Sequence, residues 1–148
     1  MSHDYPNIAK ELLESLGGRD NIEQAAHCVT RLRLALKNLG WRRNGTTWVH
    51  PEPDRQIVFL GDFIDRGPEN GAVIRIVREL MDAGRAQAIM GNHELNAIHF
   101  HTVDPETGTP LRRHDTDNLV QHESFLKEFP LGTSHTKDVL GWMKGLPL

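Results

Sequence analysis

The stretch VFLGDFIDRGPENG at residues 58–71 is an apolar run that ends in a dense group of polar residues, and AIMGNHELNAI at residues 88–98 repeats this arrangement. Residues 56–60 and 86–90 have the composition of buried strands, and residues 71–83 place apolar side chains at helical spacing. A strand, a helix and a second strand favour a parallel pair with a right-handed crossover. The sequence therefore predicts an α/β fold with both polar groups at the carboxyl ends of neighbouring strands, where open α/β sheets bind ligands.

The front of the chain is predicted to be helical at residues 7–16, where apolar residues recur at helical spacing and two glycines follow as a stop signal. Residues 21–26 are expected to form a further short turn of helix. Two interpretations stay open for residues 29–37. The leucines there alternate with charged residues as in a half-buried strand, and apolar residues recur equally well at the spacing of a helix.

Turn-forming residues predict how the rest of the chain is divided. Asn44-Gly45 lies between aromatic and β-branched residues and predicts a small hairpin. After residue 96 the chain is polar to about residue 117, and within it VDPETGTPLRR at residues 103–113, with two prolines, predicts an exposed loop. Two helices are predicted beyond that loop, at residues 118–129 and 136–144.

The charge balance argues against nucleic acid as a partner. The 148 residues include 17 Lys and Arg against 20 Asp and Glu, which leaves no positive excess to bind a phosphate backbone. The N-terminus lacks a basic segment followed by an apolar run, and no stretch reaches the roughly 18 apolar residues of a membrane-spanning helix. We therefore expect a cytoplasmic protein without a membrane span.

Cysteine and histidine residues are interpreted separately from the two motifs. The single cysteine, Cys28, has no intramolecular disulfide partner, so its role would be in packing or in thiol chemistry. The chain has nine histidines, and most are interpreted as solvated loop residues. Those in the polar C-terminal region are His99, His101, His114, His122 and His135.

The first polar group offers ligands for a metal ion and for a phosphate. Asp62 directly follows Gly61, so the backbone can turn there and present the carboxylate to a cleft, which suits a divalent metal. Asp65 could orient a neighbouring histidine by accepting its ring N–H, and Arg66 has the planar fork that binds phosphate oxygens. Taken singly, an Asp after a strand is usually a helix cap, and an Asp-Arg pair is usually a surface ion pair.

The second polar group complements the first. Asn92 can offer a carbonyl oxygen to a metal, and His93 could protonate a leaving oxygen, with Glu94 supporting both. An isolated Asn-His pair is usually a loop feature. Two such groups at the ends of successive parallel strands are harder to explain by capping alone, and together they predict a metal-dependent site.

GDFIDRG at residues 61–67, followed by GNHE at residues 91–94, resembles the calcineurin-like metallophosphoesterases. That family includes serine/threonine protein phosphatases and bis(nucleosyl)-tetraphosphate hydrolases. The resemblance covers residues 39–148 and implies a partial core of the family fold built on the parallel βαβ unit. It also implies a dinuclear metal centre, with manganese favoured and iron or zinc as alternatives, that activates water for in-line attack on phosphorus.

The resemblance also implies a role for each matched residue. Asp62 would bridge the two ions, and Asn92 would bind the second one. His93 would assist the leaving group with Asp65 behind it, and Arg66 would contact the phosphate of a phosphoprotein or nucleotide substrate.

Several ligands that the family uses have no counterpart in these 148 residues. The family pattern begins with Asp-x-His, which occurs nowhere in the chain, and later draws on two histidines, one of them in a Gly-His context. No motif assigns His99, His101 or His122 to the metals. With only Asp62 and Asn92 matched, metal affinity should be reduced.

A second resemblance begins the chain. LLESLGGRDNIEQAAHCVTRLRLALKN at residues 12–38 resembles the start of the IIB domain of sugar phosphotransferase permeases, of the glucose, sucrose and β-glucoside superfamily. There a helix ending in Gly-Gly precedes a strand that carries a phosphocysteine. Cys28 matches that cysteine, and Arg31 and Arg33 match basic residues that would neutralise the phosphoryl group. The resemblance implies a IIA protein as phosphodonor.

The two resemblances together predict the organisation of the chain. Residues 1–37 are expected to be a IIB-like fragment and residues 38–148 a truncated calcineurin-like domain. The leading prediction is a metal-dependent phosphoester hydrolase or a truncated descendant of one. The alternatives are phosphoryl transfer through Cys28 and an inactive chimeric or truncated chain.

Overall fold

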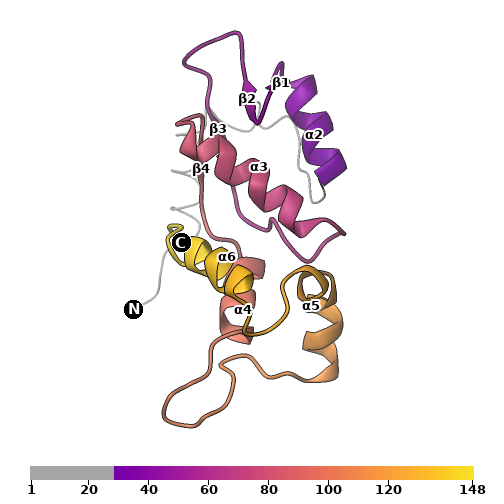
Figure 1. Ribbon diagram of the computed structural model, residues 1–148, viewed down its shortest axis with the longest axis vertical. Helices are drawn as coiled ribbons and strands as arrows, with labels where there is room; N and C mark the ends of the chain where they lie inside the picture. Colours follow the sequence, from indigo (N-terminus) through magenta and orange to yellow (C-terminus); the bar gives the residue numbers. More distant parts are fainter. Residues whose placement is uncertain (1–28) are drawn as a thin grey trace, which may run out of the picture.

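The computed structural model describes residues 29–148 of the chain, so the helices predicted at residues 7–16 and 21–26, together with Cys28, lie outside the described residues. Its elements follow one another from an α-helix and a hairpin to a βαβ unit and three further helices (Figure 1). In chain order they are α2 (Val29–Asn38), β1 (Arg42–Asn44), β2 (Thr47–Val49), β3 (Ile57–Phe59), α3 (Asn70–Asp82), β4 (Ala86–Ala88), α4 (Asn92–Phe100), α5 (Thr116–Glu128) and α6 (Ser134–Lys144). No helix within these described residues is long and apolar enough to cross a bilayer.

The predicted βαβ unit is confirmed. β3 and β4 pair in parallel, with Ile57 opposite Ala86 and Phe59 opposite Ala88, and α3 connects them. Both strands are shorter than the sequence predicts, since β3 ends at Phe59 and β4 at Ala88, ahead of the polar groups. The two polar groups therefore follow strands that end at the same edge of the sheet.

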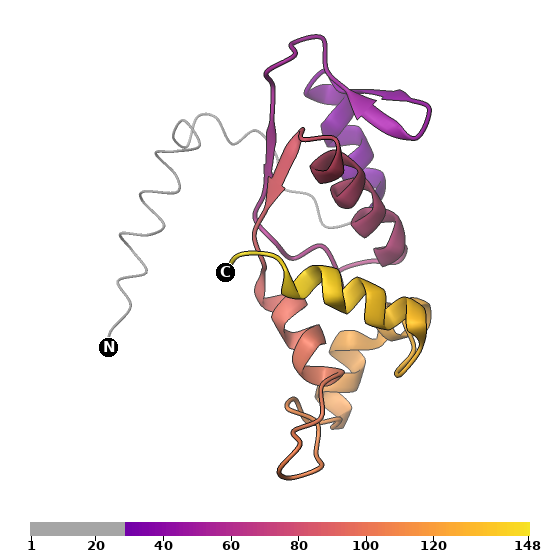
Figure 2. The same cartoon turned by 60° about the vertical axis from the view of Figure 1, so that its left-hand side comes forward.

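Helix α3 holds this unit together. Its apolar stripe is buried and packs against β4, β2 and α2, and Figure 2 shows α2 and α3 on one side of the two strands. Full burial of an aliphatic side chain contributes about 1.5–3 kcal/mol, so this stripe is a main source of stability. The buried residues of the stripe are Val73, Ile74, Ile76, Val77 and Leu80.

Helix α2 resolves the ambiguity in residues 29–37. Leu32 and Leu36 are buried, as both interpretations require, whereas Leu34 is 53% exposed. A half-buried strand would have placed Leu34 on the same face as Leu32 and Leu36. The strand interpretation, which the IIB-like pattern implies for this segment, is therefore wrong for these residues, because the leucine stripe packs on α3 as a helix.

The predicted hairpin is also confirmed. β1 and β2 pair in antiparallel register, with Asn44 opposite Thr47 across a tight turn. Trp41, just before β1, and Trp48, in β2, are both buried. An ion pair between Arg43 and Glu79, at 2.9 Å, fastens the hairpin to α3.

The remaining helices lie at the carboxyl end of the strands. α5 and α6 confirm the predicted helices with shifted bounds, and each is capped by a side chain, Asp115 for α5 and Thr133 for α6. The expectation that the chain is polar after residue 96 is wrong for residues 97–100, which continue α4 and are largely buried. Ala97, Ile98 and Phe100 on that helix are buried, so packing against neighbouring helices stabilises it where local pattern did not indicate one.

The two polar loops touch through their backbones. Gly61 has a φ of +81°, and a Cβ atom there would lie 2.2 Å from the backbone nitrogen of Gly91. A Cβ atom at Gly91 would in turn lie 2.4 Å from the backbone nitrogen of Asp62. Only glycine allows this approach, so both glycines are required for the loops to meet.

We expect Gly61→Ala to be far more destabilising than Gly84→Ala. Gly84 also has a positive φ, +67°, but a Cβ atom there meets nothing within 4 Å. The Gly84 variant should lose about 1–2 kcal/mol from backbone strain alone. The Gly61 variant should lose about 3 kcal/mol more, because the clash separates the loops and breaks charge-assisted hydrogen bonds between them.

Urea denaturation of both variants measures this difference in the free energy of unfolding. Equal losses in the two variants would contradict the close approach of the loops.

Candidate functional site

One carboxylate joins the two polar loops. Glu94 is fully buried, and its carboxylate accepts the backbone N–H groups of Asp62 and Phe63, each at 2.7 Å, and of Gly91 at 3.0 Å. Burial raises the pKa of Glu94 above its usual value, while these N–H groups act in the opposite direction. Glu94 thus holds the loop after β3 against the loop after β4.

Asp62 lies where a carboxylate is electrostatically favoured. Its φ of +58° is in the left-handed region, and its Oδ1 accepts the backbone N–H of His93 at 3.2 Å. The Asp62 carboxylate is therefore placed at the positive end of α4. Asn92, the first residue of α4, is exposed beside it.

Asp62 and Asn92 offer oxygen ligands, which fit a hard divalent ion in kind. In number they fall short, because the described part of the chain contains no group of three or more His, Cys, Asp or Glu residues that could hold a metal ion. Asp62 and Asn92 would therefore supply only part of a coordination shell.

Asp65 and His93 form a buried pair. Asp65 Oδ2 lies 3.0 Å from His93 Nδ1, and only 1% of the Asp65 side chain and 5% of the His93 side chain are exposed. The φ of Asp65 is +69°, and its N–H donates to Asn70 Oδ1 at 2.9 Å. Because the ionised carboxylate can only accept, the pair holds the proton of His93 on Nδ1 and leaves Nε2 for other contacts.

The interpretation of His122 as a solvated loop residue is wrong. Its side chain is 0% exposed, and its Nδ1 lies 2.9 Å from Asp65 Oδ1. His122 stands three residues before Phe125 and seven before Phe129, and all three are buried. This helical spacing with two buried aromatic residues is the sequence signal that could have placed His122 in the core.

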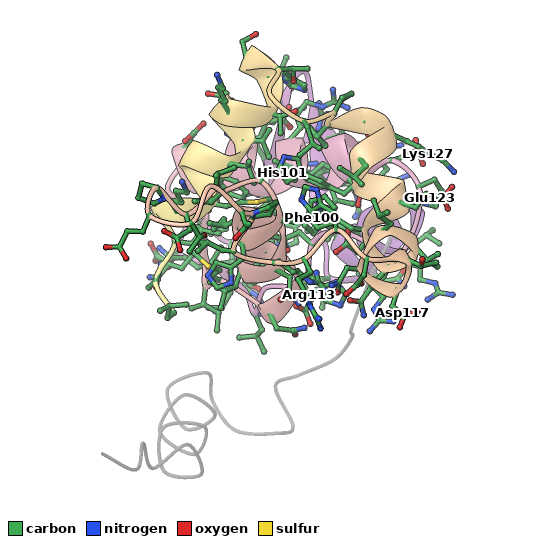
Figure 3. The ribbon with its side chains drawn as sticks, turned by 90° about the horizontal axis from the view of Figure 1, so that it is seen from below. Phe100, His101, Arg113, Asp117, Glu123 and Lys127 are labelled. Carbon is green, nitrogen blue, oxygen red and sulfur yellow. The ribbon has the colours of Figure 1, made fainter. Side chains whose placement is uncertain are left out.

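His101 extends this series of hydrogen-bonded histidine rings. Its Nε2 lies 3.3 Å from His122 Nε2, and its ring meets the ring of Phe125 edge-on at 5.8 Å. Burial, together with smaller contributions from the neighbouring His122 and His114, lowers the pKa of His101 to about 4. Figure 3 shows Phe100 and His101 near the centre of the molecule, whereas Glu123 and Lys127 project outward from α5.

The other sequence-predicted residues lie apart from this cluster. Arg66 is exposed, and the structure gives its guanidinium no ion-pair partner among residues 29–148. Arg31 and Arg33 are exposed on α2. Cys28 lies outside the described residues.

A second carboxylate, on α5, was not predicted. Glu128 accepts the backbone N–H groups of Asn70 and Gly71 at the start of α3, and also the Asn70 side-chain amide at 3.0 Å. Asn70 in turn accepts from the backbone of Asp65. No short motif in the sequence pairs residue 128 with residue 70, because the two are far apart along the chain.

Polar loops at the carboxyl ends of two parallel strands, with a buried aspartate–histidine pair between them, place this chain among α/β proteins that bind ligands at the sheet edge. Comparison of the sequence with known families agrees and is more specific. The model of the calcineurin-like phosphoesterases matches residues 27–146, and the chain belongs to that family.

Relatives in the matched region are nucleotide hydrolases by name. A bis(5′-nucleosyl)-tetraphosphatase PrpE (asymmetrical) of Oceanobacillus iheyensis is 39% identical over 74 residues, which are 50% of this chain and 29% of the relative. A symmetrical bis(5′-nucleosyl)-tetraphosphatase of a Janthinobacterium species is 46% identical over 46 residues, 31% of this chain and 16% of the relative. The matched stretch thus spans less than a third of either relative.

The N-terminal segment matches a different family. Residues 10–39 match the model of phosphotransferase system EIIB, as the sequence predicts. The sucrose-specific EIIBC component of Bacillus subtilis is 60% identical over 35 residues, which are 24% of this chain and 8% of the relative. The two family matches overlap between residues 27 and 39.

We expect His101 to remain neutral at pH values where an ordinary histidine is protonated. Its pKa of about 4 in the folded chain lies below the usual 6.5, so between these values the unfolded chain binds more protons. The free energy of unfolding should therefore decrease as the pH falls from 6.5 to about 4, and His101→Gln should lack this part of the decrease.

Histidine NMR titration and urea denaturation at several pH values measure both effects. Protonation of His101 near pH 6.5 would contradict the buried environment of its ring.

Proposed function

We propose that the chain derives from, and carries the acid–base half of, a metal-dependent phosphoester hydrolase whose substrate is a nucleoside polyphosphate. The observation that carries the proposal is the buried Asp65–His93 pair next to Asp62 at the carboxyl edge of β3 and β4. Membership of the calcineurin-like phosphoesterases supports the reaction class. The names of the tetraphosphatase relatives support a nucleotide over a phosphoprotein.

His93 is the proposed acid of this site. A proton on Nδ1 is held by Asp65, so Nε2 is the nitrogen that would protonate the leaving oxygen. Arg66, exposed and without an ion-pair partner in the described part of the chain, would bind phosphate oxygens with its planar fork. Glu94 keeps the loops that carry these residues together.

Asp62 and Asn92 would hold divalent metal, and manganese is the ion we propose to test first. Bound ions of this kind supply a Lewis acid for the phosphoryl group and an activated water. The Asp62 carboxylate is oriented for this purpose by the backbone N–H of His93, at 3.2 Å.

The expected outcome is manganese-dependent hydrolysis of diadenosine tetraphosphate that Asp62→Asn reduces about 100-fold or more, because the substitution removes a carboxylate that would hold the metal. Asp82→Asn is the matched control, since Asp82 is an exposed carboxylate at the end of α3 and its loss should leave kcat/KM unchanged. Chromatography of the nucleotide products measures the rates.

Counting retained manganese by elemental analysis separates an active enzyme from a descendant. About two ions per chain would support a complete centre. No retained ion and no turnover would contradict hydrolysis by this chain and identify it as a truncated relative.

A second candidate function is phosphoryl transfer through Cys28, which the match of residues 10–39 to phosphotransferase system EIIB favours. On this proposal residues 1–37 act as a IIB-like fragment, residues 38–148 form the phosphoesterase part, and a IIA protein is the donor. Incubation with a phosphorylated IIA protein should then place one phosphate on the chain. The Cys28→Ser variant should not be labelled. Equal labelling of the Ser variant, or no labelling of either, would exclude this function.

A further inference from the structure

The Asp65 carboxylate binds two histidine rings, and one of them lies outside both sequence motifs. His93 Nδ1 lies 3.0 Å from Oδ2, and His122 Nδ1 lies 2.9 Å from Oδ1. We propose that His122 is a positioning residue, which fixes the Asp65 carboxylate so that the carboxylate in turn fixes the ring of His93. The catalytic meaning of this inference rests on the proposed function, whereas the hydrogen bonds themselves do not.

Packing leaves the His122 ring little freedom. It stacks on Phe125, with ring centroids 4.9 Å apart and planes inclined by 23°, and it meets the ring of Phe100 at 5.0 Å. The side chain is fully buried, so neither ring nitrogen can exchange its partner for bulk water. Both nitrogens have protein partners, Asp65 on one side and His101 on the other.

The chemistry of the partners assigns a proton to each ring. An ionised carboxylate only accepts hydrogen bonds, so His93 and His122 each donate an Nδ1–H to Asp65. A neutral His122 then accepts at Nε2, and the donor is the Nε2–H of His101. The low pKa of His101 agrees with a neutral ring there. One ordered chain of hydrogen bonds thus runs from His101 to His93.

Removing His122 would leave Asp65 half supported. Oδ1 of Asp65 would be buried without a partner, and a buried unsatisfied acceptor is costly. Asp65 also has a left-handed backbone, with a φ of +69°, which persists only where the surroundings hold it. The carboxylate would then rotate or admit water, and the His93 ring would lose its single orientation.

Histidine tautomers provide a direct test on the full 148-residue chain labelled with 15N-histidine. In the wild type, His93 should be a single Nδ1–H tautomer with a slowly exchanging ring proton. In His122→Phe, which keeps the ring but removes the donor, that proton should exchange about tenfold faster or more, and both tautomers should be populated. His122→Asn, whose amide nitrogen takes the place of Nδ1, should restore the wild-type pattern.

Two further variants complete the comparison. His135→Asn, an exposed histidine at the start of α6, controls for the loss of any histidine and should leave His93 unchanged. Should His122→Phe fail to fold, His122→Gln replaces it, since its amide reaches the Nε2 position and offers Asp65 no donor. Circular dichroism reports folding in each case.

The outcomes separate this proposal from the proposed function. An unchanged His93 tautomer and exchange rate in the variant without the donor would overturn the positioning role, and so would an Asn variant as perturbed as the Phe variant. If the spectra change as expected and the chain hydrolyses diadenosine tetraphosphate, kcat should fall about tenfold in the Phe variant and recover in the Asn variant, with KM unchanged. If the spectra change as expected and no variant shows turnover, the proposed function fails and the positioning role stands.

Discussion

The Glu94 carboxylate is the contact on which the rest of the site depends. It accepts backbone N–H groups from both polar loops, which lie thirty residues apart in the chain, and it is fully buried. Charge-assisted hydrogen bonds of this kind are roughly twice as strong as neutral ones. They hold the loops close enough that Gly61 and Gly91 meet backbone to backbone, with no room for a side chain between them.

Strain in the first loop is held by contacts from distant segments. Asp62, Asp65 and Glu69 are the residues other than glycine that have positive φ values in the described part of the chain, and all lie within one loop. Glu94 fixes the first of them, and Asn70 with the two histidine rings fixes the second. Left-handed backbone at such positions costs about 1–3 kcal/mol each and is found mainly at functional sites. The strained loop conformation thus sets the positions of the loop's side chains, and residues from other segments of the chain stabilise it.

Helix α5 is the element that completes this support. It contributes His122 to the Asp65 carboxylate and Glu128 to the start of α3, so it contacts the strained loop at its middle and at its end. At the other end of the chain, α2 packs on α3 through Leu32 and Leu36. The described part of the segment shared by the two family matches, helix α2, therefore packs into the core formed with α3, although it also continues the EIIB-like sequence.

The local sequence pattern was sufficient to predict the βαβ unit and the hairpin. The alternation and spacing of apolar residues predict β3, α3 and β4, and the turn at Asn44-Gly45 predicts the hairpin. The motif spacing also brings Asp65 and His93 to the same sheet edge, because parallel strands end together. Periodicity could not decide residues 29–37, because a strand and a helix both bury Leu32 and Leu36. The two interpretations differ at Leu34, which a strand would bury and which is exposed in the structure.

By itself, the sequence determined that two polar motifs follow two parallel strands, because a strand–helix–strand order and the apolar spacing are encoded within some forty neighbouring residues. The tertiary structure alone decided which distant side chains hold those motifs in place. His122 reaches Asp65 across 57 residues and Glu128 reaches Asn70 across 58, and neither pair shares any local signal. Such contacts form because buried polar groups must find partners wherever the packed helices bring them, and packing is a property of the whole chain.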